Sequence, residues 1–503
     1  MPRRIIRRTR LLHVLALSFV LSGCIGTHGI KPHGHALPPD SLATDQAIRS
    51  AAQDAHWPVS QWWRVYADPQ LDRLIELATE GSPSLVIAAA RVRQARALAG
   101  LAESAESPQI QGTASLARHD WPNDQFYGPG ALADTRTWDN NAALGLSYPL
   151  DFWGRDRNAS EQALDLAHMS VAQQRQAQLE LQENIVRAYI QLSLNHARLE
   201  ILEATLAQQQ QLLDLARRRL AGGLGTHLEV SQAESTLPQT HRRIDALEEA
   251  IALGRNQLAA LAGKGPGEGV AVRRPSLSLQ AELRLPSALP AQLLGQRPDV
   301  VASRWQVAAQ ARGIDVAHAG FYPNVDLTGS LGYMATGGGM LEFLTGKKLS
   351  YEVGPAISLP IFDGGRLRAE LGQASAGYDI AVAQYNQTLV MALQDISDQL
   401  IRRESMDKQR EFAAESVAAA QKTFDIAMVA YRRGLTDYLN VLNAQTLLFR
   451  QQEVRQQVEA ARLTAYAGLV VALGGGLSAG DDAPTDDETA APETPAALAV
   501  FDK

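Results

Sequence analysis

The sequence predicts an α+β chain that contains one long structural unit twice. Segments 211 residues apart resemble each other: "LSYPLDFWGR" (146–155) is matched by "ISLPIFDGGR" (357–366), and "GLGTHLEVSQA" (223–233) by "GLTDYLNVLNA" (434–444). In each unit, stretches with strand-like alternation precede a very long stretch without proline. Two copies of one unit account for this spacing, which is far larger than the repeat of a solenoid protein.

The chain begins with a segment typical of a secretory signal peptide, residues 1–23. Five arginines precede the apolar run "LLHVLALSFVL", which is too short to cross a bilayer as a helix, so a retained transmembrane anchor is the weaker alternative. Cys24 follows and is the only cysteine in 503 residues. "LSGC" resembles the bacterial lipobox, in which the cysteine becomes the first mature residue and carries lipid. The alternative is an ordinary buried cysteine.

Composition narrows the class of protein. Cleavage before Cys24 leaves 42 basic and 54 acidic residues, a net charge of −12, which argues against nucleic acid as a partner. A hydrophobic fraction of 46% with only 6% aromatic residues is typical of long helices. No later apolar run approaches ~20 residues, so no membrane-spanning helix is expected. The linker at residues 24–55 and the acidic tail at 478–503 are expected to be extended or disordered.

Residues 56–265 are expected to form the first copy and residues 297–477 the second, joined by an equatorial connector at 266–296. Each copy begins with an alanine-rich helix of roughly 25 residues. Two strands follow in each copy, because apolar and polar residues alternate with a period of two. Gly- and Pro-containing stretches join the strands as loops. The apolar strand positions are Ile110, Gly112, Ala114, Leu116, Trp138, Ala142, Leu144, Leu146, Tyr148, Val325, Leu327, Gly329, Leu331, Tyr333, Tyr351, Val353, Ile357 and Leu359.

Each copy continues into a long helical hairpin. No proline occurs between Pro149 and Pro238 or between Pro360 and Pro484, which leaves room for helices of about 65 residues, near 100 Å long. Both helices end at glycine-containing turns, "AGGLGT" and "RRGLTD", after which the chain returns as a second helix. Coiled-coil seams are expected at Leu371, Ser375, Tyr378, Val382, Tyr385, Leu389, Ala392 and Ile396, and at Leu181, Ile185, Ala188 and Leu192.

The strands require more than one chain. One face of the four strands is apolar enough for lipid, but an open sheet cannot lie in hydrocarbon because its edges would be unpaired. Three chains with four strands each would close a barrel of about twelve strands, which is within the range of outer-membrane barrels and wide enough for water. The predicted fold is therefore a trimeric outer-membrane β-barrel, continued on the periplasmic side by a long α-helical barrel.

The chain resembles the outer-membrane efflux factors of the TolC/OprM type, specifically the lipoprotein branch that serves tripartite multidrug exporters. The matching stretches are "QWWRVYADPQLDRLIELA", "GQRPDV", "AGFYPNVDLTGSLGY", "SLPIFDGGRLRAE" and "AYRRGLTDYLNVLNAQTLLF", spread from about residue 60 to residue 475. The resemblance implies a homotrimeric exit duct without catalytic activity. It also implies a periplasmic adaptor and an inner-membrane pump, usually of the proton-driven RND class, as partners.

The same resemblance suggests which residues form the closed periplasmic mouth. It puts Leu439 at a hydrophobic constriction, while Asn440 and Asn443 fall where relatives often place aspartates. Because amides attract cations less than carboxylates do, we expect a constriction that is less selective for cations, although Asp437 lies nearby. The alternative is that both asparagines are plain solvated helix positions. The adaptor-contacting tips are expected at Gly222, Gly223, Leu224, Gly225, Thr226, Arg433, Gly434, Leu435, Thr436 and Asp437.

Other functional classes explain less of the sequence. A structural coiled-coil lipoprotein that tethers envelope layers would account for Cys24 and the helices but leave the strands unused. A lipid-anchored enzyme would need a reactive constellation, and the sequence has no Gly-x-Ser-x-Gly elbow, no His-Glu-x-x-His pair and no zinc spacing. We therefore expect no catalytic residues, cofactor or metal. Trp62 and Trp63 are predicted in a core, and Arg155 and Arg366 either solvate a strand-to-helix turn or face a lumen.

Overall fold

The computed structural model describes residues 26–27, 29–38, 42, 60–122, 132–277 and 297–476. The predicted signal peptide, Cys24 and the tail at 478–503 lie outside these ranges, as do most of the linker and of the connector. The chain folds into two compact units, each built from separate segments. Of the described residues, those within 1–37, 90–170 and 303–387 form unit 1, and those within 38–89, 171–302 and 388–503 form unit 2.

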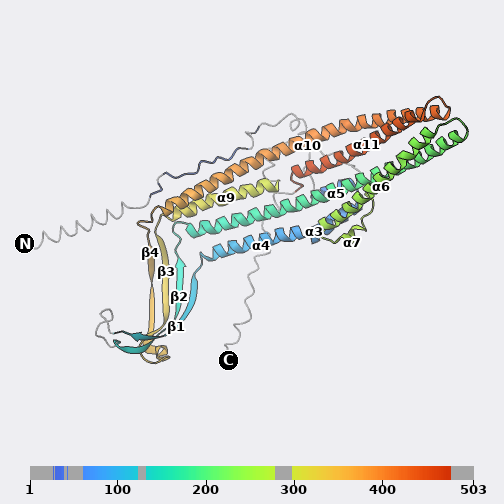
Figure 1. Ribbon diagram of the computed structural model, residues 1–503. Helices are drawn as coiled ribbons and strands as arrows, with labels where there is room; N and C mark the ends of the chain where they lie inside the picture. Colours follow the sequence, from blue (N-terminus) through green and yellow to red (C-terminus); the bar gives the residue numbers. More distant parts are fainter. Residues whose placement is uncertain are drawn as a thin grey trace, which may run out of the picture. The chain divides into compact units, whose positions relative to one another are not determined.

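The order helix, two strands, long helix and return helix occurs twice along the chain (Figure 1). In the first occurrence the elements are α4 (Pro83–Ser104), β1 (Gln109–Trp121), β2 (Thr135–Pro149), α5 (Arg155–Ala221) and α6 (His227–Leu261). In the second they are α9 (Pro298–Ala319), β3 (Asn324–Thr336), β4 (Leu349–Ser358), α10 (Arg366–Arg432) and α11 (Tyr438–Ala472). The shorter elements are η2 (Trp62–Tyr66), α3 (Pro69–Gly81), α7 (Pro266–Gly269), η3 (Glu342–Leu344) and η4 (Gly346–Lys348).

The long helices α5 and α10 have 67 residues each, and the return helices α6 and α11 have 35 each. These lengths confirm the hairpins expected from the proline-free stretches. Proline does occur inside α6, at Pro238, where it removes one backbone donor from the helix. Within the described residues, none of the helices is both long and apolar enough to cross a membrane.

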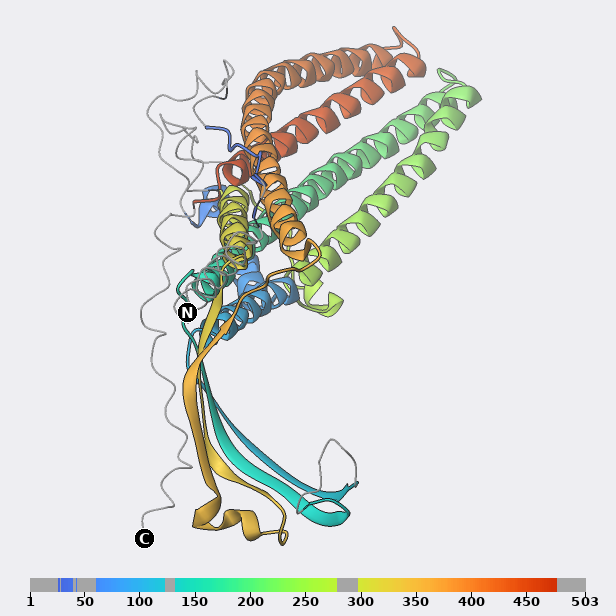
Figure 2. The same ribbon diagram turned by 90° about the vertical axis from the view of Figure 1, so that its left-hand side faces the viewer.

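The four strands of unit 1 form one antiparallel sheet in the order β1-β2-β3-β4, and Figure 2 shows how strongly it curves. The register aligns Gly112, Leu144, Leu331 and Tyr351 across the sheet, so the predicted apolar positions of all four strands share one face. The opposite face carries Gln111, Thr113, Ser147, Thr328, Ser330 and Glu352. The predicted alternation is therefore confirmed, although Leu359 lies just beyond the end of β4.

The sheet is left open within the described part of this chain, because β1 and β4 each pair on one side only. The connection between β3 and β4 was expected to be a plain loop, and this was wrong in part. It contains η3 and η4, and the buried side chain of Phe343 gives this segment an apolar anchor that the glycines around it do not suggest.

Helix α9 packs between α5 and α10 in unit 1. A Cβ at Gly313 would lie 3.0 Å from the Gln162 Nε2 of α5, and a Cβ at Gly377 would lie 3.0 Å from the Gln310 Oε1 of α9. Each contact therefore places a glutamine of one helix over a glycine of the next, which lets the helices approach closely.

Part of the linker, residues 29–38, lies along α10; we call this segment the strap. The backbone N–H groups of His33 and Gly34 both donate to Oδ1 of Asp379, at 2.8 and 2.6 Å. Further along the helix, the Asn386 amide accepts a hydrogen bond from the backbone of the strap and donates another to it. The strap has no helix or strand, so backbone bonds to two side chains of α10 hold it in place.

Unit 2 contains two hydrophobic clusters. The larger joins η2 and α3 to α5, α6 and α11, and it buries Trp62 and Trp63 as predicted. The smaller one lies near the hairpin turns and includes Leu212, Tyr431 and Tyr438. The predicted seam positions on α5 and α10 are buried, except for Tyr378, which is half-buried.

Candidate functional site at the hairpin turns

The two hairpins of unit 2 end in turns of the same geometry. After α5, the N–H of Gly223 donates to the carbonyl of Leu220, and the N–H of Leu224 donates to the carbonyl of Arg219, at 3.0 and 2.9 Å. The corresponding two bonds form after α10, around Gly434. The two glycines have φ angles of 70° and 74°, a left-handed conformation that disfavours other residues. This requirement explains why both predicted tips contain glycine.

Side-chain caps start the two return helices. The Thr226 hydroxyl accepts a hydrogen bond from the N–H of Glu229 at 3.2 Å, and the Asp437 carboxylate accepts one from the N–H of Asn440 at 3.1 Å. The side-chain amide of Asn440 also donates to Asp437 at 2.9 Å and to the Thr436 hydroxyl at 2.8 Å. Asn440 therefore stabilises the first turn of α11.

The predicted constriction residues share one side of α11. Leu439, Asn440 and Asn443 are exposed in the isolated chain, whereas Tyr438 and Val441 between them are fully buried. This division follows the helical period, because residues three and four apart lie on the same face. The arrangement brings the three predicted side chains together on a surface that another chain or a lumen could meet.

A cation links the two hairpins at their turns. One guanidinium nitrogen of Arg219 donates to the backbone carbonyl of Tyr431 at 3.0 Å, and the other donates to the carbonyl of Leu224, also at 3.0 Å. The same guanidinium lies 4.7 Å from the centroid of the Tyr431 ring, which is a cation–π contact. The Tyr431 hydroxyl in turn donates to Glu229 of the first hairpin at 3.4 Å. Arg219, Tyr431 and Glu229 thus form a three-residue link between hairpins.

The two tyrosines near this link, Tyr431 and Tyr438, are weaker acids than an exposed tyrosine. Burial raises the pKa of Tyr438 to about 12, with a further contribution from Tyr431. Burial and the negative charge of Glu229 raise the pKa of Tyr431 as well. Both rings are therefore neutral in the physiological range, and they pack edge to face with centroids 5.9 Å apart.

Sequence reasoning did not single out Arg219 and Glu229. They occupy positions equivalent to Ala430 and Asn440 in the second copy, at the same 211-residue offset. The two copies thus differ in charge at the places where they touch each other. Comparing charge between the copies, rather than only searching for similarity, would have identified both residues.

The predicted tips expose apolar side chains. Leu224 and Leu435 are 73% and 76% exposed, and each follows the left-handed glycine of its turn. Elsewhere in the described part of the chain, no three His, Cys, Asp or Glu side chains gather in a way that could hold a metal ion. The predicted lipidation site, Cys24, lies outside the described residues.

A sheet with one apolar face and free edges, combined with two long hairpins that end in matched turns, is the architecture of an outer-membrane channel subunit. The family described as "Outer membrane efflux protein" matches residues 74–264 and 289–475, and the chain belongs to this family. The match includes all four strands and both hairpins, and the family is one of transport channels.

Individual relatives agree with this assignment. The chain is 55% identical over 369 residues to the fusaric acid resistance protein FusA of Burkholderia cepacia, covering 73% of this chain and 70% of FusA. It is 30% identical to the pyoverdine export outer membrane protein OpmQ of Pseudomonas aeruginosa, covering 92% and 96% of the two chains. Among solved structures, the outer membrane protein VceC of Vibrio cholerae superposes with a TM-score of 0.79 at 33% identity, covering 84% of this chain and all of VceC.

Proposed function

We propose that the chain is the exit duct of a tripartite efflux pump in the outer membrane. The observation that carries this proposal is the family match across both copies of the repeat, which includes the sheet and both hairpins. Relatives are named for fusaric acid resistance, pyoverdine export and multidrug resistance. The cargo of this chain would accordingly be toxic or secreted small molecules that a partner pump delivers.

The functional unit in this proposal is a homotrimer. The edges of β1 and β4 need partner strands if the apolar face is to contact lipid, and three copies would supply about twelve strands in a closed barrel. Exposed side chains on the apolar face, among them Ile110, Tyr351 and Val353, support contact with lipid.

The internal repeat also suggests how helices of neighbouring chains would pack. Within one chain Gln162 of α5 lies over Gly313 of α9. Helices α4 and α9 begin 215 residues apart, so the equivalent positions in the other copy are Gln373 of α10 and Leu98 of α4. Both side chains are exposed in the isolated chain. We therefore place α10 of one chain against α4 of the next, which would continue the helical layer around a tube.

Three further elements of the proposal concern the membrane and the partners. Cys24 would be acylated and would anchor the mature N-terminus in the inner leaflet of the outer membrane. The exposed leucines of the tips, Leu224 and Leu435, would contact a periplasmic adaptor. The inner-membrane partner would be a pump of the RND class.

The closed mouth of the duct would lie at Leu439, Asn440 and Asn443, on the exposed side of α11. The test is single-channel conductance of the purified trimer in a planar bilayer, for the wild type and for Leu439→Ala combined with Asn443→Ala. We expect a low-conductance wild type and a variant that conducts several-fold better. A matched control is Leu228→Ala, which removes an exposed leucine near the other tip.

Two outcomes would count against the proposal. Insertion without any conductance in wild type and variant would favour a structural tether over a duct. Equal conductance in both, with selectivity for cations as in relatives that carry aspartates, would remove the constriction from this part of α11.

A further inference from the structure

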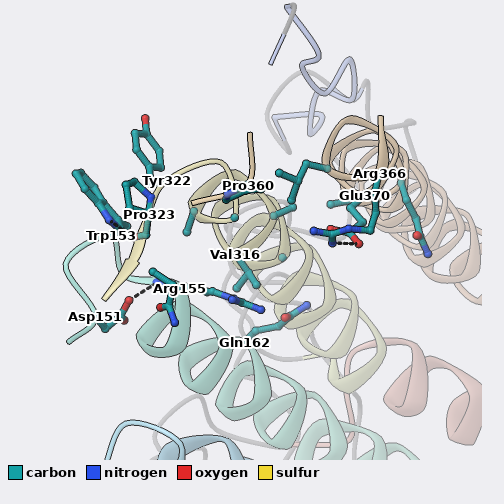
Figure 3. Close-up of a pocket in the computed structure, with 18 of the residues that line it drawn as sticks. Asp151, Trp153, Arg155, Gln162, Val316, Tyr322, Pro323, Pro360, Arg366 and Glu370 are labelled. Atoms are coloured by element: carbon teal, nitrogen blue, oxygen red, sulfur yellow. Dashed lines mark hydrogen bonds and ion pairs between the residues drawn. The ribbon is translucent and has the colours of Figure 1, made fainter. Parts of the chain in front are cut away.

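Unit 1 contains a cavity of about 920 Å³ where the strands join the helices (Figure 3). Its walls come from the starts of α5 and α10, from the end of α9, and from the turns that connect these helices to the sheet. The volume is within the range of sites for small organic ligands. Arg155 and Arg366 line this cavity. For these two arginines the sequence left open whether they solvate a strand-to-helix turn or face a lumen.

The two arginines differ in whether they form an ion pair. Arg366 pairs with Glu370 one helical turn later, at 2.7 Å, on an exposed surface. Arg155 forms no ion pair with any described residue, and Figure 3 shows it reaching into the cavity from α5. Two carboxylates lie near it in sequence: Asp156, the next residue, whose charge interacts with that of Arg155, and Asp151, which accepts hydrogen bonds from three backbone N–H groups of the α5 start. The guanidinium of Arg155 is therefore not held by either carboxylate in an ion pair, and its N–H donors face the cavity.

An aromatic wall lies beside these charges. The rings of Trp153 and Tyr322 are stacked, with centroids 4.6 Å apart and planes 17° from parallel. The Trp153 indole N–H donates to the Pro323 carbonyl at 2.9 Å, which holds the ring in place. A fixed apolar surface next to a guanidinium suits a ligand that has both a flat ring and an anionic group.

The strap lies on the side of α10 that is opposite to Arg366. Asp379 and Asn386 follow Arg366 by 13 and 20 residues, so at 100° per residue they lie about 140–160° around α10 from it. If the N-terminus is acylated, as proposed above, the strap must run on the outside of the tube, because acyl chains cannot lie in an aqueous lumen. The cavity then opens toward the lumen.

We propose that this cavity is a binding station for small aromatic carboxylates on their way through the duct. Arg155, supported by Arg366, attracts the carboxylate, and the stacked pair of Trp153 and Tyr322 receives the ring. Three copies in a trimer place six arginines around the lumen at one level. The proposal rests on the proposed function for the direction in which the cavity opens, and it names the class of cargo.

Binding can be measured without any conduction. Purified full-length protein in detergent is titrated with benzoate and with benzamide, which has the same shape but no charge, and line broadening of the ligand NMR signals is recorded at low salt. We expect benzoate to broaden roughly threefold more than benzamide, and Arg155→Gln combined with Arg366→Gln to abolish the difference. The matched control is Arg157→Gln with Arg368→Gln, which removes equal charge two residues later, about 200° around each helix.

Equal broadening by benzamide, or equal loss in the control variant, would overturn the site. The direction of the cavity is tested by reversal potentials of the same variants in a salt gradient. We expect the Arg155/Arg366 variant to lose anion preference and the Arg157/Arg368 variant to keep it. Intact benzoate binding with unchanged reversal potentials would place the cavity outside the lumen and overturn the role in transport, while leaving the duct itself in place.

Discussion

The two return helices, α6 and α11, have the same length and follow the same kind of turn, yet they pack very differently. Fourteen residues of α11 are buried, against five of α6. The last third of α11 is nearly all apolar or small, and its Gly468 lets Gln399 of α10 approach so closely that a Cβ would lie 2.9 Å from it. The two return helices thus share their length and turn, while α11 contributes many more residues to the core than α6 does.

This difference shows that the length of a return helix and the burial of its side chains depend on separate features of the sequence. Glycines and caps fix where each hairpin turns, and these features are shared. Burial depends on composition. Helix α6 carries Pro238 and the charged stretch "HRRIDALEE" (241–249), whereas the equivalent stretch of α11 is "QEVRQQVEA" (452–460), which a long apolar end follows. Helix α6 is therefore the more exposed of the two return helices in the isolated chain.

The largest expected effect comes from truncating one buried leucine of α11 and one exposed leucine of α6. Leu469 of α11 is fully buried, and Leu253 of α6 is 59% exposed. We expect Leu469→Ala to lower the free energy of unfolding by about 2–5 kcal/mol and Leu253→Ala by no more than about 0.5 kcal/mol. The guanidinium midpoint of helix loss, followed by circular dichroism, measures both. Similar costs would mean that another chain covers Leu253 in the assembly.

A smaller effect is expected from cutting the link between the hairpins. Arg219→Gln removes the cation–π contact with Tyr431 and weakens the bonds to two carbonyls. The closed arrangement should lose about 1–3 kcal/mol, so the open fraction seen in single-channel recordings should rise roughly 5- to 150-fold. Arg218→Gln, at the exposed neighbouring position, serves as the control. No change in open fraction would show that the hairpins stay together without this link.

The smallest expected effect is on the pH dependence of stability. It concerns two positions that are equivalent in the two copies, His196 and Asp407. His196 of α5 corresponds to Asp407 of α10, which pairs with Arg462 at 2.8 Å. Burial, followed by the charges of Arg255 and Arg274, lowers the pKa of His196 from its ordinary 6.5. The unfolded chain therefore binds more protons just below pH 6.5, so stability should fall as the pH drops through this region.

His196→Gln should flatten this part of the pH profile of the unfolding midpoint by a small amount, and Asp407→Asn provides the comparison on the other hairpin. An unchanged slope between pH 7 and 5 in His196→Gln would show that other groups account for the acid sensitivity.

Much of the fold could be predicted because it depends on local patterns. Proline-free stretches gave the lengths of α5 and α10, and period-two alternation assigned Leu144 and Leu331 to one face, which the register confirms. The contacts that could not be predicted join residues far apart in the sequence. Arg219 meets Tyr431 across 212 residues, and the strap meets Asp379 across 346, with no periodicity to indicate either. The roles of Leu439, Asn440 and Asn443 as a constriction stay predictions.

If Cys24 is acylated, as proposed above, the strap also limits how deep the channel can sit in the membrane. Nine residues separate Cys24 from His33, and a fully extended chain of that length spans about 30 Å. Asp379, which holds His33, lies 13 residues into α10, or about 20 Å along the helix from its first residue. With Cys24 acylated, the lipid headgroups would therefore lie at most about 10 Å beyond the level at which α10 begins. In that case the linker sets an upper limit on the distance between the membrane surface and α10, and lengthening the linker would leave the position of the channel along the membrane normal to the barrel alone.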